Sequence, residues 1–195
     1  ENIAFTGNTT LALNMAIKGC AGAKNHVILT SMEHNSVARP VYACGAQYTV
    51  VRANQEGSID PAAIARAIRS DTKLIVVNHA SNVCGSLQDV AAIGAIAARS
   101  GILFLVDAAQ SAGVVPIDVD AMQIDMLAFA GHKSLMGPLG TGGLYVRKGL
   151  LLDTIIEGGS GSSSESREAL LKKWRRTDRI CDLNGVADFL ISDIR

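Results

Sequence analysis

Short apolar runs alternate with longer amphipathic stretches along most of this chain. The apolar runs are rich in β-branched residues and lack strict alternation, which is typical of strands buried on both faces of a sheet. They occupy residues 26–31, 48–53, 73–78, 102–107, 125–130 and 142–148. The stretches between them have helical spacing and occupy residues 9–20, 36–47, 60–70 and 89–101. This alternation predicts a mostly parallel sheet with helices on both faces.

Local signals mark helix ends and divide the chain into parts. Asp60 and Asp89 stand where N-caps are expected, and Pro61 suits a first helical turn. Residues 158–166, GGSGSSSES, have the composition of a flexible linker. We therefore expect a domain over 1–157, a linker over 158–166 and a basic, helical tail over 167–195.

Composition excludes several classes of protein. Of the 195 residues, 48% are apolar, which excludes a disordered chain, and the 18 basic and 18 acidic residues balance. This balance gives no reason to expect nucleic acid or a membrane surface as a partner. No apolar run approaches the roughly 20 residues of a membrane helix, and the start of the chain lacks the pattern of a signal peptide. The cysteines, widely spaced at Cys20, Cys44, Cys84 and Cys181, predict free thiols in a reducing, cytoplasmic compartment.

Polar residues follow the predicted strands at the point where each strand ends. In such sheets, ligands bind beyond the carboxyl ends of the strands. The residues at these positions are His34, Asn82, Asp107 with Gln110, and His132 with Lys133. In addition, the turn TGNTT (6–10) opens the first predicted helix.

Each of these residues has a functional and an ordinary interpretation. Backbone N–H groups at the TGNTT turn can bind a phosphate, or the turn can simply cap the helix. His34 can stack on a flat ring or transfer protons, or it can be a surface turn histidine. Asp107 can pair with a cationic ring nitrogen or bond its own turn, and Gln110 can bind a ligand oxygen or only solvent. Lys133 can be a nucleophile toward aldehydes or a solvated loop lysine.

Taken together, these groups match the parts of pyridoxal 5′-phosphate. The set offers an anion cradle, a stacking imidazole, an acid for the pyridine nitrogen and an amine for a Schiff base. The sequence predicts no metal site.

The motifs TGNTT, EHNS, HASNVCG, DAAQS and GHKSLMGPLGTGGLY occur in this order. Over residues 1–166 the chain resembles the class V aminotransferase family, in its cysteine desulfurase and selenocysteine lyase branch. The resemblance implies the large domain of fold-type I pyridoxal phosphate enzymes, a three-layer α/β/α domain with a mostly parallel mixed sheet. It also implies a homodimer, and conversion of L-cysteine to L-alanine and enzyme-bound sulfur.

The resemblance also implies a role for each candidate residue. Lys133 would form the Schiff base, and His34 would stack on the ring as a second catalytic residue. Asp107 would bind the pyridine nitrogen and Gln110 the ring oxygen, while Asn82 would lie near the ring oxygen and the substrate carboxylate. The phosphate would be bound by Asn8, Thr9, Thr10 and His132.

The chain departs from the family pattern at several points. Ala130 stands where members usually carry a hydroxyl residue of the phosphate site. We find no counterpart of the C-terminal domain that carries the persulfide cysteine and the carboxylate-binding arginine, and we expect Cys181 to be a buried thiol of the tail. These departures predict a truncated chain. Two alternatives therefore stay open: an aminotransferase or other lyase acting on a small amino acid, and a non-catalytic remnant or interaction module.

Overall fold

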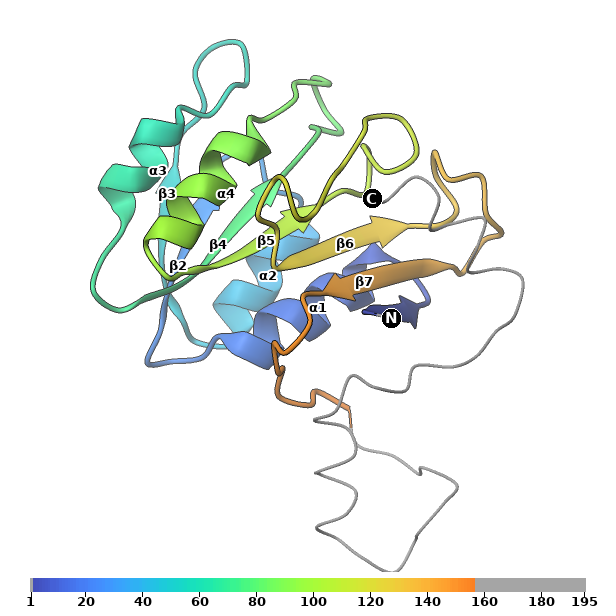
Figure 1. Cartoon of the computed structure of the whole chain (residues 1–195), viewed down its shortest axis with the longest axis horizontal. Helices are drawn as coiled ribbons and strands as arrows, with labels where there is room; N and C mark the ends of the chain where they lie inside the picture. Colours follow the sequence, from blue (N-terminus) through green and yellow to red (C-terminus); the bar gives the residue numbers. More distant parts are fainter. Residues whose placement is uncertain (1, 157–195) are drawn as a thin grey trace, which may run out of the picture.

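The computed structural model describes residues 2–156, which form a seven-stranded sheet flanked by helices (Figure 1). The strand order is β1-β7-β6-β5-β4-β2-β3. The strands are β1 (Ile3–Thr6), β2 (His26–Thr30), β3 (Gln47–Val51), β4 (Thr72–Asn78), β5 (Leu103–Asp107), β6 (Met126–Ala130) and β7 (Gly142–Val146).

Most strands of the sheet run in one direction. Strands β3, β2, β4, β5 and β6 are parallel, and β7 is antiparallel to both of its neighbours, β6 and β1. Consequently β1 to β6 all end at the same edge of the sheet, which we call the carboxyl edge. In the register, Asn78 pairs with Asp107 and Asp107 with Ala128, so the ends of β4, β5 and β6 lie side by side. The predicted mostly parallel mixed sheet is confirmed.

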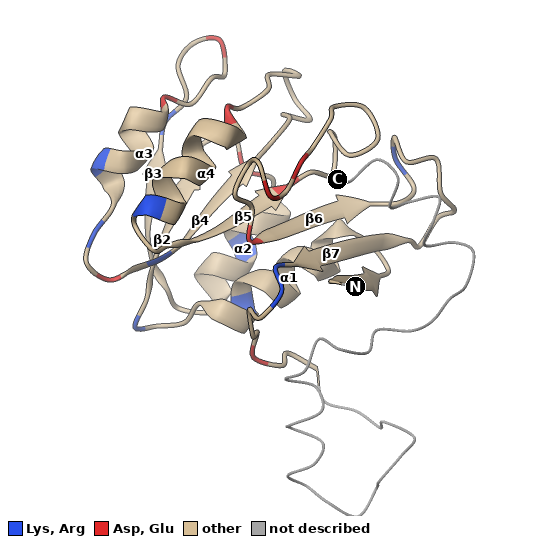
Figure 2. Ribbon diagram, in the orientation of Figure 1, with Lys and Arg blue, Asp and Glu red and all other residues tan. Residues whose placement is uncertain are grey.

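Helices cover both faces of the sheet. They are α1 (Thr9–Cys20), α2 (Asn35–Ala43), α3 (Pro61–Ala67) and α4 (Val90–Arg99). Leu13 of α1 and Val37 of α2 belong to the apolar core of one face, while Ile64 of α3 and Ile93 of α4 belong to the core of the other. The two separate cores confirm the predicted three-layer α/β/α fold. Strands β6 and β7, between these layers, carry no charged residue (Figure 2).

Side-chain caps explain where the helices begin. The Asn8 Oδ1 accepts a hydrogen bond from the backbone N–H of Leu11 at 2.9 Å and so caps α1. Asp60 caps α3 and Asp89 caps α4 in the same way, each at 2.9 Å, as the sequence predicts. Helix α1 spans the predicted residues 9–20.

The prediction is wrong in the region after α2. The helix expected over 36–47 ends at Ala43, because Gly45 adopts a left-handed φ of +73° and turns the chain into β3. Strand β3 is also not buried on both faces, since it lies at the sheet edge and exposes Tyr48 and Val50. The helix expected over 60–70 likewise stops early, at Ala67.

Several predictions concern segments outside the described residues. The linker over 158–166, the tail over 167–195 and Cys181 all lie there. Within residues 2–156, none of the helices has both the length and the apolar character needed to span a membrane. The cysteines described, Cys20, Cys44 and Cys84, are free thiols.

Candidate functional site

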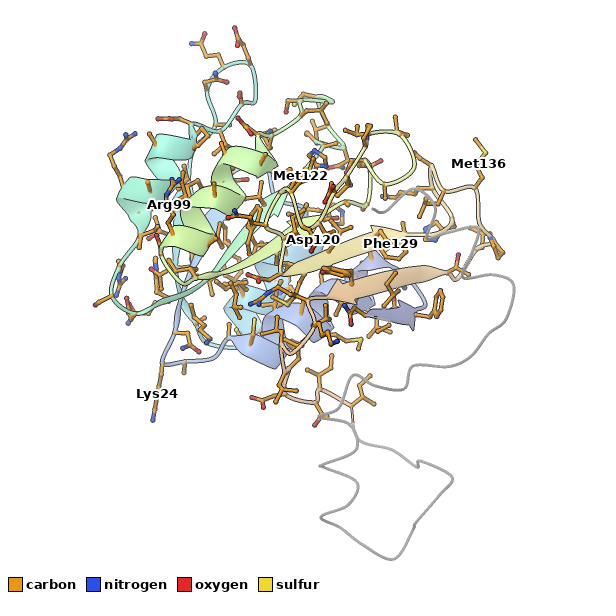
Figure 3. All side chains as sticks on the ribbon, in the orientation of Figure 1. Lys24, Arg99, Asp120, Met122, Phe129 and Met136 are labelled. Carbon is orange, nitrogen blue, oxygen red and sulfur yellow. The ribbon has the colours of Figure 1, made fainter. Side chains whose placement is uncertain are left out.

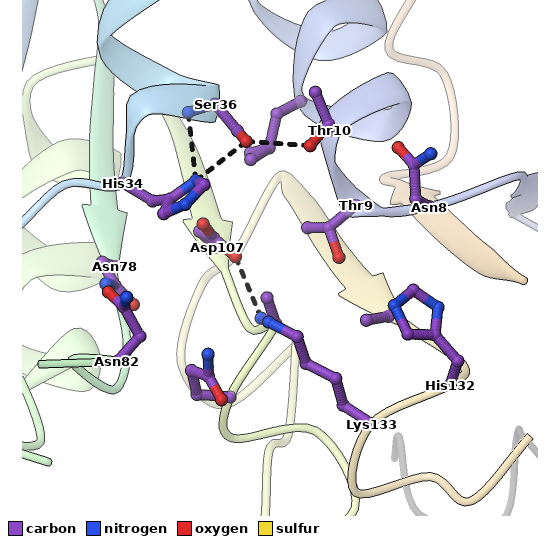
Figure 4. Close-up of a pocket in the computed structure, with 14 residues that line it drawn as sticks. Asn8, Thr9, Thr10, His34, Ser36, Asn78, Asn82, Asp107, His132 and Lys133 are labelled. Carbon is purple, nitrogen blue, oxygen red and sulfur yellow. Dashed lines mark hydrogen bonds between the residues drawn. The ribbon is translucent and has the colours of Figure 1, made fainter. Parts of the chain in front are cut away.

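The predicted site residues line one cavity of about 170 Å³ at the carboxyl edge (Figure 4). They come from the start of α1 and from the turns that follow β2, β4, β5 and β6. The residues predicted from sequence and found in the wall of this cavity are Asn8, Thr9, Thr10, His34, Asn82, Asp107, Gln110, His132 and Lys133. The structure thus brings together the whole predicted set, whose individual roles stay predictions.

The N-terminus of α1 offers unused hydrogen-bond donors to the cavity. In the described part of the chain, the backbone N–H groups of Thr9 and Thr10 have no hydrogen-bond partner. The Thr9 hydroxyl is also buried without a partner, and Figure 4 shows it directed into the cavity. Gly142 of β7 packs against this turn, where an added Cβ would lie 3.0 Å from the Cα of Asn8. The arrangement is suited to binding an anion.

Asp107 ends β5 and is only 3% exposed. Burial raises the pKa of its carboxyl, while the N–H of Ala109 and the fields of Lys133 and His34 oppose that rise. Oδ1 accepts the Ala109 N–H at 2.9 Å, so the local turn bond considered from sequence exists. The bond occupies Oδ1 alone, and Oδ2 has no hydrogen-bond partner within residues 2–156. Asp107 can therefore also serve a cationic ligand atom.

Lys133 belongs to the loop between β6 and β7. Hydrogen bonds from Gly137 N–H to Gly131 O (2.7 Å) and from Met136 N–H to the Lys133 carbonyl (2.9 Å) close this loop on itself. Beside Lys133, the ring Nδ1 of His132 donates to the Thr141 carbonyl at 3.1 Å. Met136 projects away from the fold and is 90% exposed (Figure 3). The loop thus holds the Lys133 amine at the cavity, while Met136, farther along the loop, is exposed to solvent.

The remaining wall of the cavity includes polar side chains and the apolar Ala130. No hydrogen bond to the side-chain amide of Asn82 or of Gln110 is found in the described part of the chain, so both amides are available to a ligand. Ala130 also lines the cavity, so the hydroxyl group that it lacks would have faced the ligand. Cys84 is exposed on the turn after β4 and does not line the cavity.

Glu33 is a buried acid that the predictions from sequence did not include. Its Oε1 accepts hydrogen bonds from the Thr30 hydroxyl (2.7 Å) and from the Asn78 backbone N–H (3.0 Å), which ties the ends of β2 and β4 together. Its Oε2 is buried and has no hydrogen-bond partner among residues 2–156. Burial raises the pKa of the Glu33 carboxyl to about 8, and the nearby charge of Asp107 contributes to the rise. An acidic residue directly after a buried strand is the signal that could have revealed it.

Ser36 is a second residue that the predictions missed. His34 precedes α2 as its N-cap, and its Nδ1 accepts a hydrogen bond from the Ser36 backbone N–H at 3.1 Å. The Ser36 hydroxyl oxygen lies 2.9 Å from the same Nδ1 and 2.8 Å from the hydroxyl oxygen of Thr10 (Figure 4). His34 is therefore held by a network that reaches from α2 to α1.

Comparison with known proteins points to one family. The family model described as Aminotransferase class-V matches residues 1–176. The chain is similar to cysteine desulfurase IscS of Dictyoglomus turgidum, at 36% identity over 172 residues, which are 85% of this chain and 43% of that protein. It is also similar to cysteine desulfurase IscS of Pseudomonas aeruginosa, at 40% identity over 155 residues, which are 76% of this chain and 38% of that protein. The chain thus spans about two fifths of the length of these curated relatives.

Solved structures give the same result. The structure described as SspA in complex with cysteine has a TM-score of 0.78 and 36% identity, over 87% of this chain and 50% of that chain. The apo cysteine desulfurase of Thermococcus onnurineus NA1 has a TM-score of 0.75 and 34% identity, over 82% of this chain and 42% of that chain. Class V aminotransferases and cysteine desulfurases are pyridoxal phosphate enzymes.

Proposed function

The chain belongs to the class V aminotransferase family, and from this membership we propose that it forms the pyridoxal phosphate-binding domain of a cysteine desulfurase. The family resemblance inferred from its motifs is confirmed, and so is its similarity to the cysteine desulfurase branch. L-cysteine is the substrate we propose, since one similar structure is described as a complex with cysteine.

The described residues fit the cofactor. The free N–H groups of Thr9 and Thr10 and the buried, unpartnered hydroxyl of Thr9 suit a phosphate. One carboxylate oxygen of Asp107 has no hydrogen-bond partner within residues 2–156 and could accept from a protonated pyridine nitrogen. Lys133 has an amine for an aldehyde. The observation that carries the proposal is this convergence of Asp107, Lys133 and the α1 N-terminus on one cavity.

Pyridoxal phosphate, when bound, supplies an electron sink for the carbanion formed at the substrate Cα. Asp107 would keep the ring nitrogen protonated, because its negative charge favours the cation. Gln110 would donate an amide N–H to the ring oxygen, and His34 would hold one ring face. The Lys133 amine would take and return the proton at the substrate Cα.

Desulfuration further requires a thiolate that meets the substrate sulfur in a productive geometry. Within residues 2–156 no cysteine lines the cavity, and Cys84 is the exposed one. We therefore propose that the domain described here binds and orients the substrate, and that the sulfur-accepting thiol lies outside it.

We also propose a homodimer that works in the cytoplasm. Met136 and Leu139, in the loop after Lys133, are 90% and 88% exposed, which is the kind of apolar surface that a second copy would cover. The free thiols Cys20, Cys44 and Cys84 are compatible with a reducing compartment.

Borohydride labelling of the purified chain tests the cofactor proposal. Added pyridoxal phosphate should produce a visible yellow absorbance, and reduction followed by peptide mapping should place the pyridoxyl label on Lys133. Lys133→Arg should lose both signals. Lys148→Arg is the matched control, because it changes an exposed lysine beyond β7 and should keep both. A label on Lys148 or Lys73 in the wild-type chain would reject the assignment.

A further inference from the structure

Thr9 and Thr10 stand side by side at the start of α1, but their hydroxyl groups have different surroundings. The Thr9 hydroxyl is buried and has no partner in the part of the chain that the structure describes, whereas the Thr10 hydroxyl oxygen lies 2.8 Å from the Ser36 hydroxyl oxygen. Figure 4 shows the former directed into the cavity and the latter turned toward Ser36. We infer that Thr10 and Ser36 are positioning residues, whose hydroxyl groups hold the His34 ring with its proton on Nε2.

The direction of each hydrogen bond follows from the one donor that cannot be reversed. A backbone N–H only donates, so the 3.1 Å contact from Ser36 N requires His34 Nδ1 to accept. The neutral ring therefore carries its proton on Nε2. Because Nδ1 has no proton to give, the Ser36 hydroxyl at 2.9 Å must donate to it. The Ser36 oxygen then accepts the proton of the Thr10 hydroxyl.

This arrangement determines what His34 can do at the cavity. Two donors converge on Nδ1, so a ring flip, which would place Cδ2–H at that position, would lose both bonds. In the described part of the chain, Nε2 has no hydrogen-bond partner, while His34 lines the cavity and lies within electrostatic reach of Asp107. The neutral ring therefore presents an N–H donor to the cavity rather than a free base.

The same hydrogen bonds separate the roles of the two threonines. A hydroxyl has one proton, and that of Thr10 is used on Ser36. Only the Thr9 hydroxyl remains free to donate to an anion, and Thr10 contributes its backbone N–H alone. The family resemblance, by contrast, predicted that both Thr9 and Thr10 bind the phosphate. This division of roles rests on the proposed cofactor site, whereas the state of the His34 ring does not.

Nitrogen-15 NMR of the histidine rings in the cofactor-free chain tests the inference directly. At a pH where the rings are neutral, His34 should show an unprotonated Nδ1 and a protonated Nε2, with signals assigned by their loss in His34→Gln. Ser36→Ala removes one of the two donors, so the Nδ1 resonance should move toward that of a free acceptor nitrogen. Thr10→Val should shift the Nδ1 resonance in the same direction by a smaller amount. It removes the hydroxyl that donates to Ser36, and so weakens the Ser36–His34 hydrogen bond only indirectly.

A second histidine–threonine pair supplies the control. The Thr49 hydroxyl oxygen lies 2.8 Å from His26 Nε2, so Thr49→Val should move the His26 signals and leave those of His34 in place. A protonated Nδ1 on His34 in the wild-type chain would overturn the inference. An Nδ1 resonance unchanged in Ser36→Ala would do so as well.

Titration with pyridoxal phosphate, followed by absorbance, tests the division between the threonines. Thr9→Val should weaken binding about tenfold or more, since it removes a donor to a charged group, and Thr10→Val should stay within about threefold. An equal loss in both variants would show that the Thr10 hydroxyl serves the phosphate and would overturn the division. If the wild-type chain does not bind the cofactor, the proposed function fails, while the NMR experiment still decides the state of His34.

Discussion

The buried carboxyl of Glu33 gives the sharpest test of the electrostatics at this site. Glu33→Gln keeps an oxygen that can accept from the Thr30 hydroxyl and the Asn78 N–H. It replaces the second carboxyl oxygen, Oε2, which is buried with no partner among the described residues, by an uncharged amide NH2 group. Because burial raises the pKa of the Glu33 carboxyl to about 8, the wild-type side chain holds a proton in the folded chain at neutral pH. The variant should therefore mimic the neutral wild type.

The size and sign of the effect follow from the two pKa values. Folding raises the pKa of the Glu33 carboxyl from 4.5 to about 8, which corresponds to about 5 kcal/mol of stability for the chain with protonated Glu33 over the chain with ionised Glu33. Below 4.5 both the folded and the unfolded chain hold the proton, and this stability is fully present. As pH rises from 4.5 to about 8, the unfolded chain releases the proton before the folded chain does, so stability falls by about 1.4 kcal/mol per pH unit. Above that window the loss is complete.

Urea unfolding of the cofactor-free chain at several pH values across this window measures the effect. The free energy of unfolding of Glu33→Gln, taken relative to wild type, should rise by about 4–5 kcal/mol from the acid to the alkaline side. Glu56→Gln makes the same chemical change on an exposed turn and is the matched control for the substitution itself. A pH-independent difference between wild type and Glu33→Gln would refute the assignment of a proton to Glu33.

Other substitutions probe the carboxylate, the thiols and the packing of the site. Asp107→Asn should stabilise the cofactor-free chain at neutral pH in thermal melting, since it removes a charge whose pKa burial raises, but it should weaken pyridoxal phosphate binding about tenfold or more in an absorbance titration. An unchanged affinity would contradict the role proposed for Asp107. Iodoacetamide should label Cys84 well before Cys20, as followed by mass spectrometry, because hydrogen bonds with Ser81 and Ser86 lower the pKa of Cys84 to about 7 while burial raises that of Cys20 to about 12. Gly142→Ala should cost about 1–3 kcal/mol in urea unfolding, since its Cβ would lie 2.8 Å from the Phe129 carbonyl oxygen, whereas Gly22→Ala, with nothing within 4 Å, should cost far less.

The positions of the site residues could be predicted because a parallel sheet imposes them. Strands that share a direction end at one edge, so residues as distant in sequence as His34 and Lys133 could be grouped without knowing any contact. The apolar runs located the ends of β4, β5 and β6 to within one residue. This precision was enough to place Asp107 and Asn82 in one cavity.

The hydrogen bonds between these residues could not be predicted in the same way. Thr10 and Ser36 are 26 residues apart, and Glu33 and the Asn78 N–H are 45 apart. Such pairs depend on how α1 packs against α2 and on the register of β2 with β4, which no local pattern specifies. The same limit explains the error in β3. Its apolar residues suit a buried strand, but the topology places it at the outer edge of the sheet.

The two edges of the sheet differ in how completely their buried polar groups are satisfied. Asp125, just before β6 and thus at the opposite edge, uses both carboxylate oxygens: Oδ1 pairs with Arg147, and Oδ2 accepts the Phe104 N–H at 2.8 Å. In residues 2–156, the buried side-chain atoms without a partner belong to Thr9, Glu33, His79 and Ser111, each shortly after the end of a strand at the carboxyl edge. An unpaired buried polar atom costs free energy, and a fold selected for stability alone would have no reason to collect such atoms at one edge. Of these residues Thr9 lines the cavity, and its unpaired hydroxyl is what a site requires when part of its hydrogen bonding is completed by a bound ligand.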